Sequence, residues 1–500
     1  MSDARVDWAA RYRELSPRIE HFIDGRHRSG QGRMHCDKFS PRDGRLLCSF
    51  EVASEETVDN AVSSARRAFE DGRWSKMAVL RRSEILNRLA RLIEEHHEEL
   101  ALLECVDVGK PISDALSVDV PMAATVIRFY AEAVNKVYSK VYSADQSSLS
   151  YEARRPVGVV GAIVGWNFPL VLAAQKIGPA LAAGNCVVLK PSELTSLSAL
   201  RLAELAIEAG VPEGVLNVVH GNGHTGALLA HHRDVRLLTF TGSTQTGKDL
   251  LIAAGRSNMK RLILECGGKA PNIVFDDCAS LAGVAESVIK SAFWNLGQVC
   301  VASSRLLVHE QVKDALLAEL VRKSSALRLG DPLDRTTTFG ALVSANHKRR
   351  VLEYIELGQQ EGARISYRCH SPAPLESGFY LGPVIFDQVT ADRRIAQEEI
   401  FGPVLCVLSF RDEDEAVAIA NSSRYGLSAT IWTRDIGRAH RMSQAIDAGW
   451  VIINTVNKPA GGPPEGVIAV GGHKESGVGV EGGIDGLDAY MAKSAIQMFV

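Results

Sequence analysis

The chain has 500 residues, 46% of them hydrophobic and 23% charged, so it can bury a large core and should divide into more than one domain. Its 56 basic and 59 acidic residues are interspersed and give a net charge of −3, which offers no electrostatic footprint for nucleic acid. Its nine cysteines lack CxxC pairs or Cys/His spacing suited to zinc, so we expect reduced thiols and no metal site.

The N-terminal segment and the most apolar stretch argue against export and membrane insertion. Residues 1–20 mix acids, bases and a proline without the apolar run of a secretory signal, which favours a cytoplasmic protein. Residues 157–174 are interrupted by glycines, Asn167 and Pro169, so a membrane helix there would leave backbone groups poorly satisfied. We expect no membrane partner.

The first elements in chain order are two amphipathic helices. Apolar residues recur at helical spacing over residues 57–68 and again over 83–103, with charges on the other face. Residues 137–151 instead mix polar and β-favouring residues, which favours a small hairpin or arm.

Two series of alternating strands and helices follow. Apolar runs at 157–164, 186–189 and 215–220 enclose helical patterns at 175–183 and 196–209, the βαβ rhythm of a parallel sheet. A second α/β domain is indicated by further apolar runs at 272–275, 305–308, 404–410, 429–432 and 450–453. The boundary between the two domains is expected near residues 266–271.

Two glycine-bearing segments suggest phosphate binding. Residues 221–226 match GxGxxG between a strand and a helix, but the acidic residue expected about twenty positions on is missing, so both a dinucleotide site and a tight glycine turn stay open. Residues 242–248 nearly match GxxxxGK[ST], which makes a nucleotide hydrolase an alternative, although Asp249 stands where a hydroxyl is required. A pyrophosphate near Ser243, at a helix N-terminus, fits either case.

Cys300 and Glu265 are ambiguous as isolated residues. Cys300 lies among glycine, amide and aromatic neighbours, a composition suited to a pocket, yet free cysteines are more often inert and buried. Glu265 ends an apolar run before two glycines, which suits a cleft, but it could also be a surface carboxylate or a partner of Lys269.

Taken together, these segments resemble the aldehyde dehydrogenase superfamily of NAD(P)-dependent, non-acylating enzymes, from about residue 21 to about 492. The resemblance rests on the order and spacing of six motifs: Gly165-Trp166-Asn167-Phe168-Pro169, Val188-Leu189-Lys190-Pro191-Ser192-Glu193, Phe240-Thr241-Gly242-Ser243, Leu264-Glu265-Cys266-Gly267-Gly268-Lys269, Gly297-Gln298-Val299-Cys300 and Glu399-Ile400-Phe401-Gly402-Pro403.

The resemblance implies a catalytic set. Cys300 would attack the aldehyde carbon and pass through a thiohemiacetal to a thioester. The amide of Asn167 and the backbone N–H of Cys300 would stabilise the oxyanion. Glu265, as general base, would activate the water that releases the carboxylic acid. Lys176 resembles a family lysine near the path by which protons leave the site.

The resemblance also implies the cofactor contacts. Lys190 and Glu193 would hold the adenosine ribose, and because a 2′-phosphate would face the Glu193 carboxylate, NAD is favoured over NADP. Glu399 and Phe401 match residues that hold the nicotinamide ribose and pack beside the ring. The remaining cofactor-binding residues implied are Trp166, Ser192, Gly223, Phe240, Gly242 and Ser243.

The implied architecture is two Rossmann-like α/β domains plus a small β oligomerisation arm. We expect an NAD-binding domain over 1–136 and 157–265, a catalytic domain over 266–475, and an arm over 137–156 and 476–500 that supports a homodimer or homotetramer. A CoA-acylating relative is an alternative that the presence of Glu265 disfavours, since such relatives generally lack the deacylating glutamate.

Some positions depart from the family pattern. Cys266 replaces the usual leucine and is either a packing residue or a second thiol able to cross-link with Cys300. Gln175 stands where many members carry a tryptophan. Lys458, in the most divergent segment, is either a solvated loop residue or one that reaches the pocket mouth and favours aldehydes with an anionic or hydrogen-bonding tail.

Overall fold

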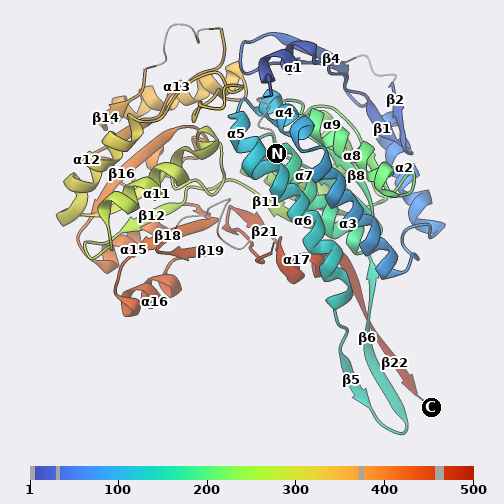
Figure 1. Cartoon of the computed structure of the whole chain (residues 1–500). Helices are drawn as coiled ribbons and strands as arrows, with labels where there is room; N and C mark the ends of the chain where they lie inside the picture. Colours follow the sequence, from blue (N-terminus) through green and yellow to red (C-terminus); the bar gives the residue numbers. More distant parts are fainter. Residues whose placement is uncertain (1–5, 30–33, 371–374, 376, 456–466, 500) are drawn as a thin grey trace.

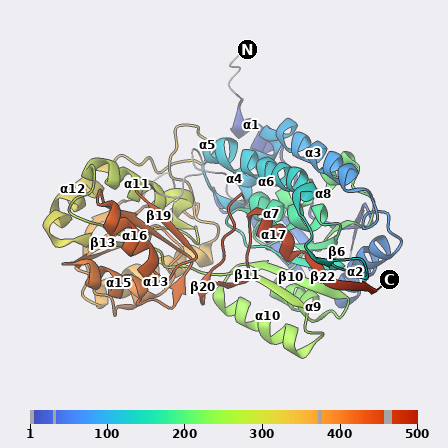
Figure 2. The same cartoon turned by 90° about the horizontal axis from the view of Figure 1, so that it is seen from below.

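A computed structural model describes residues 6–29, 34–370, 375, 377–455 and 467–499. The chain forms two α/β halves, each built on its own sheet, and a narrow β arm that leads away from them (Figure 1). The apolar side chains form two large clusters, one around each sheet, which is why the halves lie side by side as separate bodies in Figure 2. The α/β fold class is confirmed, while the domain boundaries stay a prediction.

The first sheet contains the strands expected from the first apolar series. Its central strands are parallel and almost entirely buried, as in sheets covered by helices on both faces. The order is β2 (Arg26–Arg28), β1 (His21–Ile23), β9 (Leu216–Val218), β8 (Cys186–Lys190), β7 (Val159–Ile163), β10 (Val235–Thr241), β11 (Arg261–Glu265) and β21 (Gly477–Val478). The antiparallel strands β1, β2 and β21 were not expected.

Helices cover both faces of this sheet. The helices of this half are α1 (Trp8–Glu14), α2 (Glu55–Glu70), α3 (Val79–Glu95), α4 (His97–Val108), α5 (Ile112–Asp114), α6 (Val120–Ala133), α7 (Pro169–Ala182), α8 (Leu197–Ala209), α9 (Gly223–His231), α10 (Thr244–Arg256) and α17 (Gly483–Ala489), and some of them pack on other helices instead of on the sheet. The single helix expected over 83–103 is wrong, because the chain leaves the helical conformation at His96. The α4 helix that follows is buried on every side from Leu100 to Val108, so it lacks the solvent-facing polar side that an amphipathic helix has.

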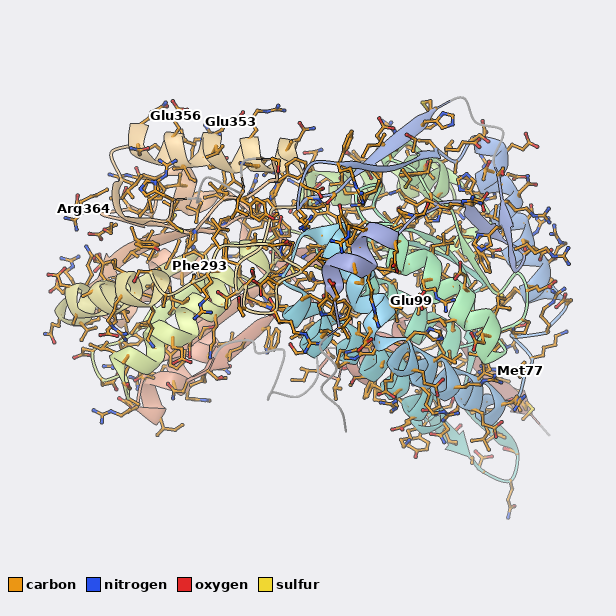
Figure 3. All side chains as sticks on the ribbon, turned by 45° about the horizontal axis from the view of Figure 1, so that its top comes forward. Met77, Glu99, Phe293, Glu353, Glu356 and Arg364 are labelled. Atoms are coloured by element: carbon orange, nitrogen blue, oxygen red, sulfur yellow. The ribbon has the colours of Figure 1, made fainter. Side chains whose placement is uncertain are left out.

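The second half repeats the scheme. Its sheet order is β14 (Arg364–Arg368), β15 (Val384–Asp387), β16 (Val404–Phe410), β13 (Arg305–His309), β12 (Pro271–Val274), β18 (Ser428–Trp432) and β19 (Trp450–Ile453). The helices are α11 (Leu281–Phe293), α12 (Lys313–Ser324), α13 (Ala345–Gln360), α14 (Arg394–Gln397), α15 (Glu413–Asn421) and α16 (Ile436–Ala445). Along α13, Val351 and Ile355 are buried, whereas Glu353 and Glu356 point outward (Figure 3).

The arm is a three-stranded antiparallel sheet of β5 (Val141–Ala144), β6 (Ser148–Pro156) and β22 (Met491–Phe499). It exposes large apolar side chains, among them Tyr138, Tyr142 and Phe499. Two smaller sheets pair β3 (His35–Phe39) with β4 (Leu46–Glu51) and β17 (Tyr425–Gly426) with β20 (His473–Lys474). Among the described residues, no helix is long and apolar enough to cross a membrane.

Candidate active site

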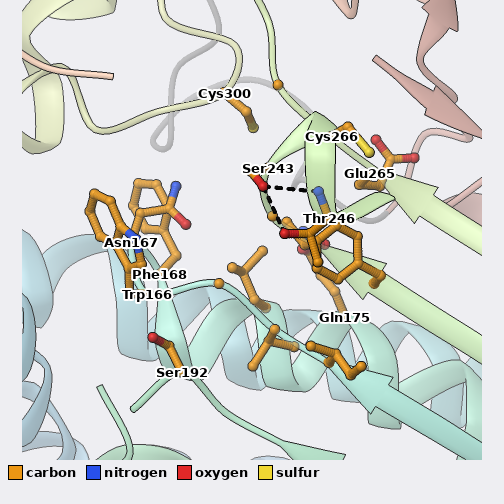
Figure 4. Close-up of a pocket in the computed structure, with 18 of the residues that line it drawn as sticks. Trp166, Asn167, Phe168, Gln175, Ser192, Ser243, Thr246, Glu265, Cys266 and Cys300 are labelled. Atoms are coloured by element: carbon orange, nitrogen blue, oxygen red, sulfur yellow. Dashed lines mark hydrogen bonds between the residues drawn. The ribbon is translucent and has the colours of Figure 1, made fainter. Parts of the chain in front are cut away.

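One large cavity lies where the two halves meet at the carboxyl ends of the first sheet's parallel strands, the position at which open α/β sheets bind ligands. Its volume is about 670 Å³. It brings together every predicted site residue except Lys176, namely Cys300, Glu265, Asn167, Trp166, Lys190, Ser192, Glu193, Gly223, Phe240, Gly242, Ser243, Glu399 and Phe401. In Figure 4, Cys300 projects into the cavity, with Asn167 and Glu265 on either side in that view.

The segment before Cys300 has an unusual backbone. Asn295 and Leu296 have φ values of 47° and 60°, a left-handed conformation that ordinary residues rarely adopt. A Cβ at Gly297 would collide with the Gly402 carbonyl, and one at Gly268 would collide with the Cys300 carbonyl. Close backbone packing therefore holds the thiol-bearing loop against two neighbouring segments, and strain of this kind persists only where the surroundings enforce it.

Asn167 is tied directly to that loop. It lies in the turn between β7 and α7 and is buried. Its Nδ2 donates to the Gln298 carbonyl at 3.0 Å, and Asn295 Nδ2 donates to the Asn167 carbonyl at 3.0 Å. An amide nitrogen carries two N–H groups, so the bond to Gln298 orients Asn167 and leaves a second donor for a ligand oxygen.

Glu265 ends β11 and is half-buried at the cavity wall. Burial, reinforced by repulsion from Glu481 and opposed by the attraction of Lys176, raises the pKa of Glu265 to about 8. Its Oε1 has no hydrogen-bond partner within the described parts of the chain. A buried carboxyl with a pKa close to neutrality suits a general base.

Lys176 does not line the cavity, and its place near the proton-relay path stays a prediction. It is fully buried on α7, and its Nζ lies 2.6 Å from Glu481 Oε1. Since Lys176 lowers the pKa of Glu265 and Glu481 raises it, this ion pair acts on Glu265 through charge. Sequence reasoning missed Glu481, which does line the cavity, because nothing in its local sequence distinguishes it from a surface glutamate.

Lys190 ends β8, Glu193 follows this strand, and both residues line the cavity. Lys190 is buried, and this burial lowers its pKa. Its Nζ donates to the Pro191 carbonyl at 2.7 Å and lies 3.9 Å from Glu193 Oε2. The Glu193 side chain is 38% exposed, so its carboxylate is available to a ligand, and Ser192 lies beside it on the cavity wall.

Two helices begin at the cavity wall, and their unpaired N–H groups fit the phosphates of a dinucleotide. Asn222 caps α9, and Ser243 caps α10 by accepting from the Thr246 N–H at 3.2 Å. A Cβ at Gly223 would meet nothing within 4 Å, so the chain leaves open space there. Lys248, the lysine of the segment 242–248 that nearly matches GxxxxGK[ST], instead pairs with Glu475 at 2.9 Å.

Glu399 and Phe401 come from the second half. Burial raises the pKa of Glu399 to about 7, and its Oε1 accepts from the Gly268 N–H at 2.9 Å. Phe401 has a left-handed backbone, with φ of 58°, and its ring packs edge-on against Trp166 at 5.1 Å between centroids. His347, which sequence reasoning missed, joins this pair: its Nε2 lies 2.7 Å from the Phe401 carbonyl. Burial lowers the pKa of His347 to about 4, so the ring is neutral and donates.

The divergent positions differ in what the structure shows. Cys266 is buried, and burial raises the pKa of its thiol to about 12, which makes it a poor nucleophile. Gln175 lines the cavity from α7. Lys458 lies outside the described residues.

Two α/β halves around a cavity that combines a thiol, a buried carboxyl and two helix N-termini define a dinucleotide-dependent oxidoreductase that uses a cysteine. The chain belongs to the aldehyde dehydrogenase family, whose model matches residues 27–496. Its reaction is the NAD(P)-dependent oxidation of an aldehyde, and the alternatives of a CoA-acylating enzyme and a nucleotide hydrolase find no support.

The chain is similar to several characterised relatives over almost its full length. It is 45% identical to the NADP/NAD-dependent aldehyde dehydrogenase PuuC of Escherichia coli strain K12, over 95% of each chain. It is 43% identical to the aminoacetaldehyde dehydrogenase of Pseudomonas aeruginosa, over 95% of this chain and 94% of that one. Among solved structures, an indole-3-acetaldehyde dehydrogenase in complex with NAD+ matches with a TM-score of 0.96 and 44% identity over 99% of each chain.

Proposed function

We propose that this enzyme oxidises its aldehyde with NAD by covalent catalysis at Cys300, followed by hydrolysis that Glu265 assists. One observation carries the proposal: Cys300, the oriented amide of Asn167 and Glu265 lie together in one cavity, and the pKa of Glu265 is raised to about 8. Each group has the chemistry that one step of the reaction needs.

Cys300 and Asn167 serve the first step. The Cys300 thiolate adds to the aldehyde carbon, a C–S bond forms, and the carbonyl electron pair moves to oxygen. The free N–H of the Asn167 amide and the Cys300 backbone N–H donate to this oxyanion. Losing one such donor typically lowers the rate by about 10²–10³. NAD, when bound, supplies the hydride acceptor, and the product of oxidation is a thioester on Cys300.

Glu265 serves the second step. Its carboxylate takes a proton from water as the water oxygen adds to the thioester carbon, after which the C–S bond breaks and the carboxylic acid leaves. The thiolate leaving group is again available for the next aldehyde. Burial raises the pKa of this base, and the two charges of the Lys176–Glu481 ion pair adjust it in opposite directions.

The cofactor half of the cavity fits NAD. Lys190 and Glu193 would hold the adenosine ribose, and the N-termini of α9 and α10 would face the pyrophosphate. Glu399 would hold the nicotinamide ribose. The Glu193 carboxylate disfavours a 2′-phosphate, which supports NAD over NADP.

The exposed apolar arm supports self-association as a homodimer or homotetramer. The outer strand β5 presents an edge with exposed Val141 and Tyr142, and edges of this kind pair with another chain. Sedimentation of the parent beside a variant with Val141→Lys and Tyr142→Lys in β5 tests this proposal, because charged side chains on an edge strand oppose pairing. We expect smaller assemblies from the variant; unchanged assemblies would contradict the proposal.

One experiment tests the catalytic roles. Purified protein, NAD and a panel of aldehydes are followed at the nicotinamide absorbance for the parent, Cys300→Ala and Glu265→Gln. Cys300→Ala should form no NADH, whereas Glu265→Gln should release at most one equivalent in a burst, because oxidation precedes hydrolysis. Cys266→Ala is the matched control, a second thiol in the same cavity, and should keep full turnover. Full turnover by Cys300→Ala would refute the mechanism.

A further inference from the structure

Helix α4 carries two fully buried carboxyl groups that lie at the N-termini of other helices. Asp107 Oδ2 accepts from the Leu197 N–H at 2.9 Å, in the first turn of α8. Glu104 Oε1 accepts from the Leu170 N–H at 3.1 Å, in the first turn of α7, and also from the Ser198 hydroxyl. Acidic groups at helix N-termini satisfy unpaired N–H groups and complement the helix dipole.

The start of α7 depends on this external acceptor. Phe168, the residue before the helix, provides no side-chain cap, and Pro169 has no N–H. The Leu170 N–H is therefore the first donor of the helix, and it lies in a buried environment where an unsatisfied N–H is costly. Glu104 supplies from a distant segment the cap that the local sequence lacks.

A second contact holds the same turn. Lys110, just after α4, is buried and pairs with Asp119. Its Nζ lies 4.1 Å from the centroid of the Phe168 ring, a cation–π distance. Phe168 and Leu170 are the residues one and three positions after Asn167, so both contacts act on the turn that carries the proposed oxyanion donor.

We infer that Glu104 is a positioning residue for Asn167: its hydrogen bond to Leu170 fixes the start of α7 and so aims the amide at the oxyanion. This inference rests on the proposed role of Asn167. No catalytic motif contains Glu104, and it does not line the cavity. Without this acceptor, the first turn of α7 would rearrange, and a displacement of about 1 Å at a catalytic group can lower the rate by about 100-fold.

Two substitutions and a control separate positioning from general stability. Glu104→Ala removes the acceptor, whereas Glu104→Gln keeps an oxygen for the Leu170 N–H. Burial raises the pKa of Glu104 to about 8, so a neutral side chain at this site is tolerated at neutral pH. Ser198→Ala is the matched control, because it removes a bond to the same Oε1 and leaves α7 alone.

We expect kcat to fall by about 10- to 100-fold in Glu104→Ala, by less than about threefold in Glu104→Gln, and hardly at all in Ser198→Ala. The decisive measurement places each substitution in an Asn167→Ala background. If Glu104 acts through Asn167, Glu104→Ala should then add little further loss. Three results would overturn the inference: a kcat as low in Ser198→Ala as in Glu104→Ala, a kcat as low in Glu104→Gln as in Glu104→Ala, or additive losses of kcat when Glu104→Ala is combined with Asn167→Ala.

The outcomes also separate this inference from the proposed function. If Asn167→Ala keeps the parent kcat, the oxyanion role itself fails. If Asn167→Ala is impaired and Glu104→Ala is not, only the positioning role fails. Should Glu104→Ala not fold, Glu104→Met fills a similar space without an acceptor for the Leu170 N–H and gives the same test in the same two backgrounds.

Discussion

The raised pKa of Glu265 predicts an alkaline pH dependence for hydrolysis of the thioester. A general base acts only when ionised, and with a pKa of about 8 only about a tenth of the Glu265 side chains are ionised at pH 7. The steady-state rate should therefore rise about tenfold for each pH unit below 8 and level off above it, wherever hydrolysis limits turnover.

The two charged neighbours allow the pKa to be moved in opposite directions. Glu481 raises the pKa of Glu265, so Glu481→Gln should lower it and shift the profile to more acidic pH. Lys176 lowers that pKa, and Lys176→Met also leaves Glu481 without its partner at 2.6 Å, so the profile should shift to more alkaline pH. For charges a few ångströms apart, shifts of about one pH unit are expected.

Stopped-flow measurement separates this effect from the earlier step. The burst of NADH reports oxidation, whereas the steady-state phase reports hydrolysis. Glu481→Gln and Lys176→Met should therefore move the inflection point in the pH profile of the steady-state rate, and leave the pH profile of the burst rate unchanged. Arg438→Met, which breaks an ion pair with Asp277 in the second half, is the control and should leave the inflection in place. Shifts in the same direction for Glu481→Gln and Lys176→Met would refute the electrostatic explanation.

Three further predictions concern stability, cofactor choice and a missed residue. Folding raises the pKa of Glu265 above its usual 4.5, so the folded state favours the protonated side chain. The contribution of Glu265 to the free energy of unfolding is therefore complete below pH 4.5 and is lost as the pH rises through about 8. Glu265→Gln should therefore be more stable than the parent at pH 9, by at most about 5 kcal/mol in denaturant titration. Glu193→Ala should raise kcat/KM with NADP about tenfold in steady-state assays, because a carboxylate facing the 2′-phosphate is removed. His347→Ala should weaken NAD binding about tenfold by calorimetry, because the Phe401 carbonyl loses its donor.

Each of these predictions has a control. In denaturant titration at pH 4, Glu265→Gln should have no higher free energy of unfolding than the parent. Glu208→Ala, on the exposed face of α8, should leave the NADP preference unchanged, and an equal change in both variants would contradict the role of Glu193. His440→Ala removes an exposed histidine from the same half as His347, so unchanged binding is expected; equal NAD affinity in parent and His347→Ala would contradict the prediction.

Local sequence patterns predicted the elements that depend on neighbouring residues. The apolar runs at 157–164 and 186–189 are β7 and β8, because a strand buried on both faces needs an uninterrupted apolar run. The same reasoning was wrong over 83–103, because the helical spacing of apolar residues continues although the helix breaks at His96. Strands β1 and β21 were missed because they are short. β1 pairs mainly with the adjacent β2 and joins the sheet through the distant β9, and β21 pairs with the distant β11.

The sequence by itself determined the family, the candidate nucleophile and the candidate base, because ordered motifs preserve chemistry at fixed spacing along the chain. Only the tertiary structure decided what surrounds these residues. Glu104 meets Leu170 across 66 positions and Lys176 meets Glu481 across 305, so no local pattern reveals either contact. The strength of a hydrogen bond or of a charge–charge interaction depends on the distance between the atoms, and the packing of the whole chain sets that distance.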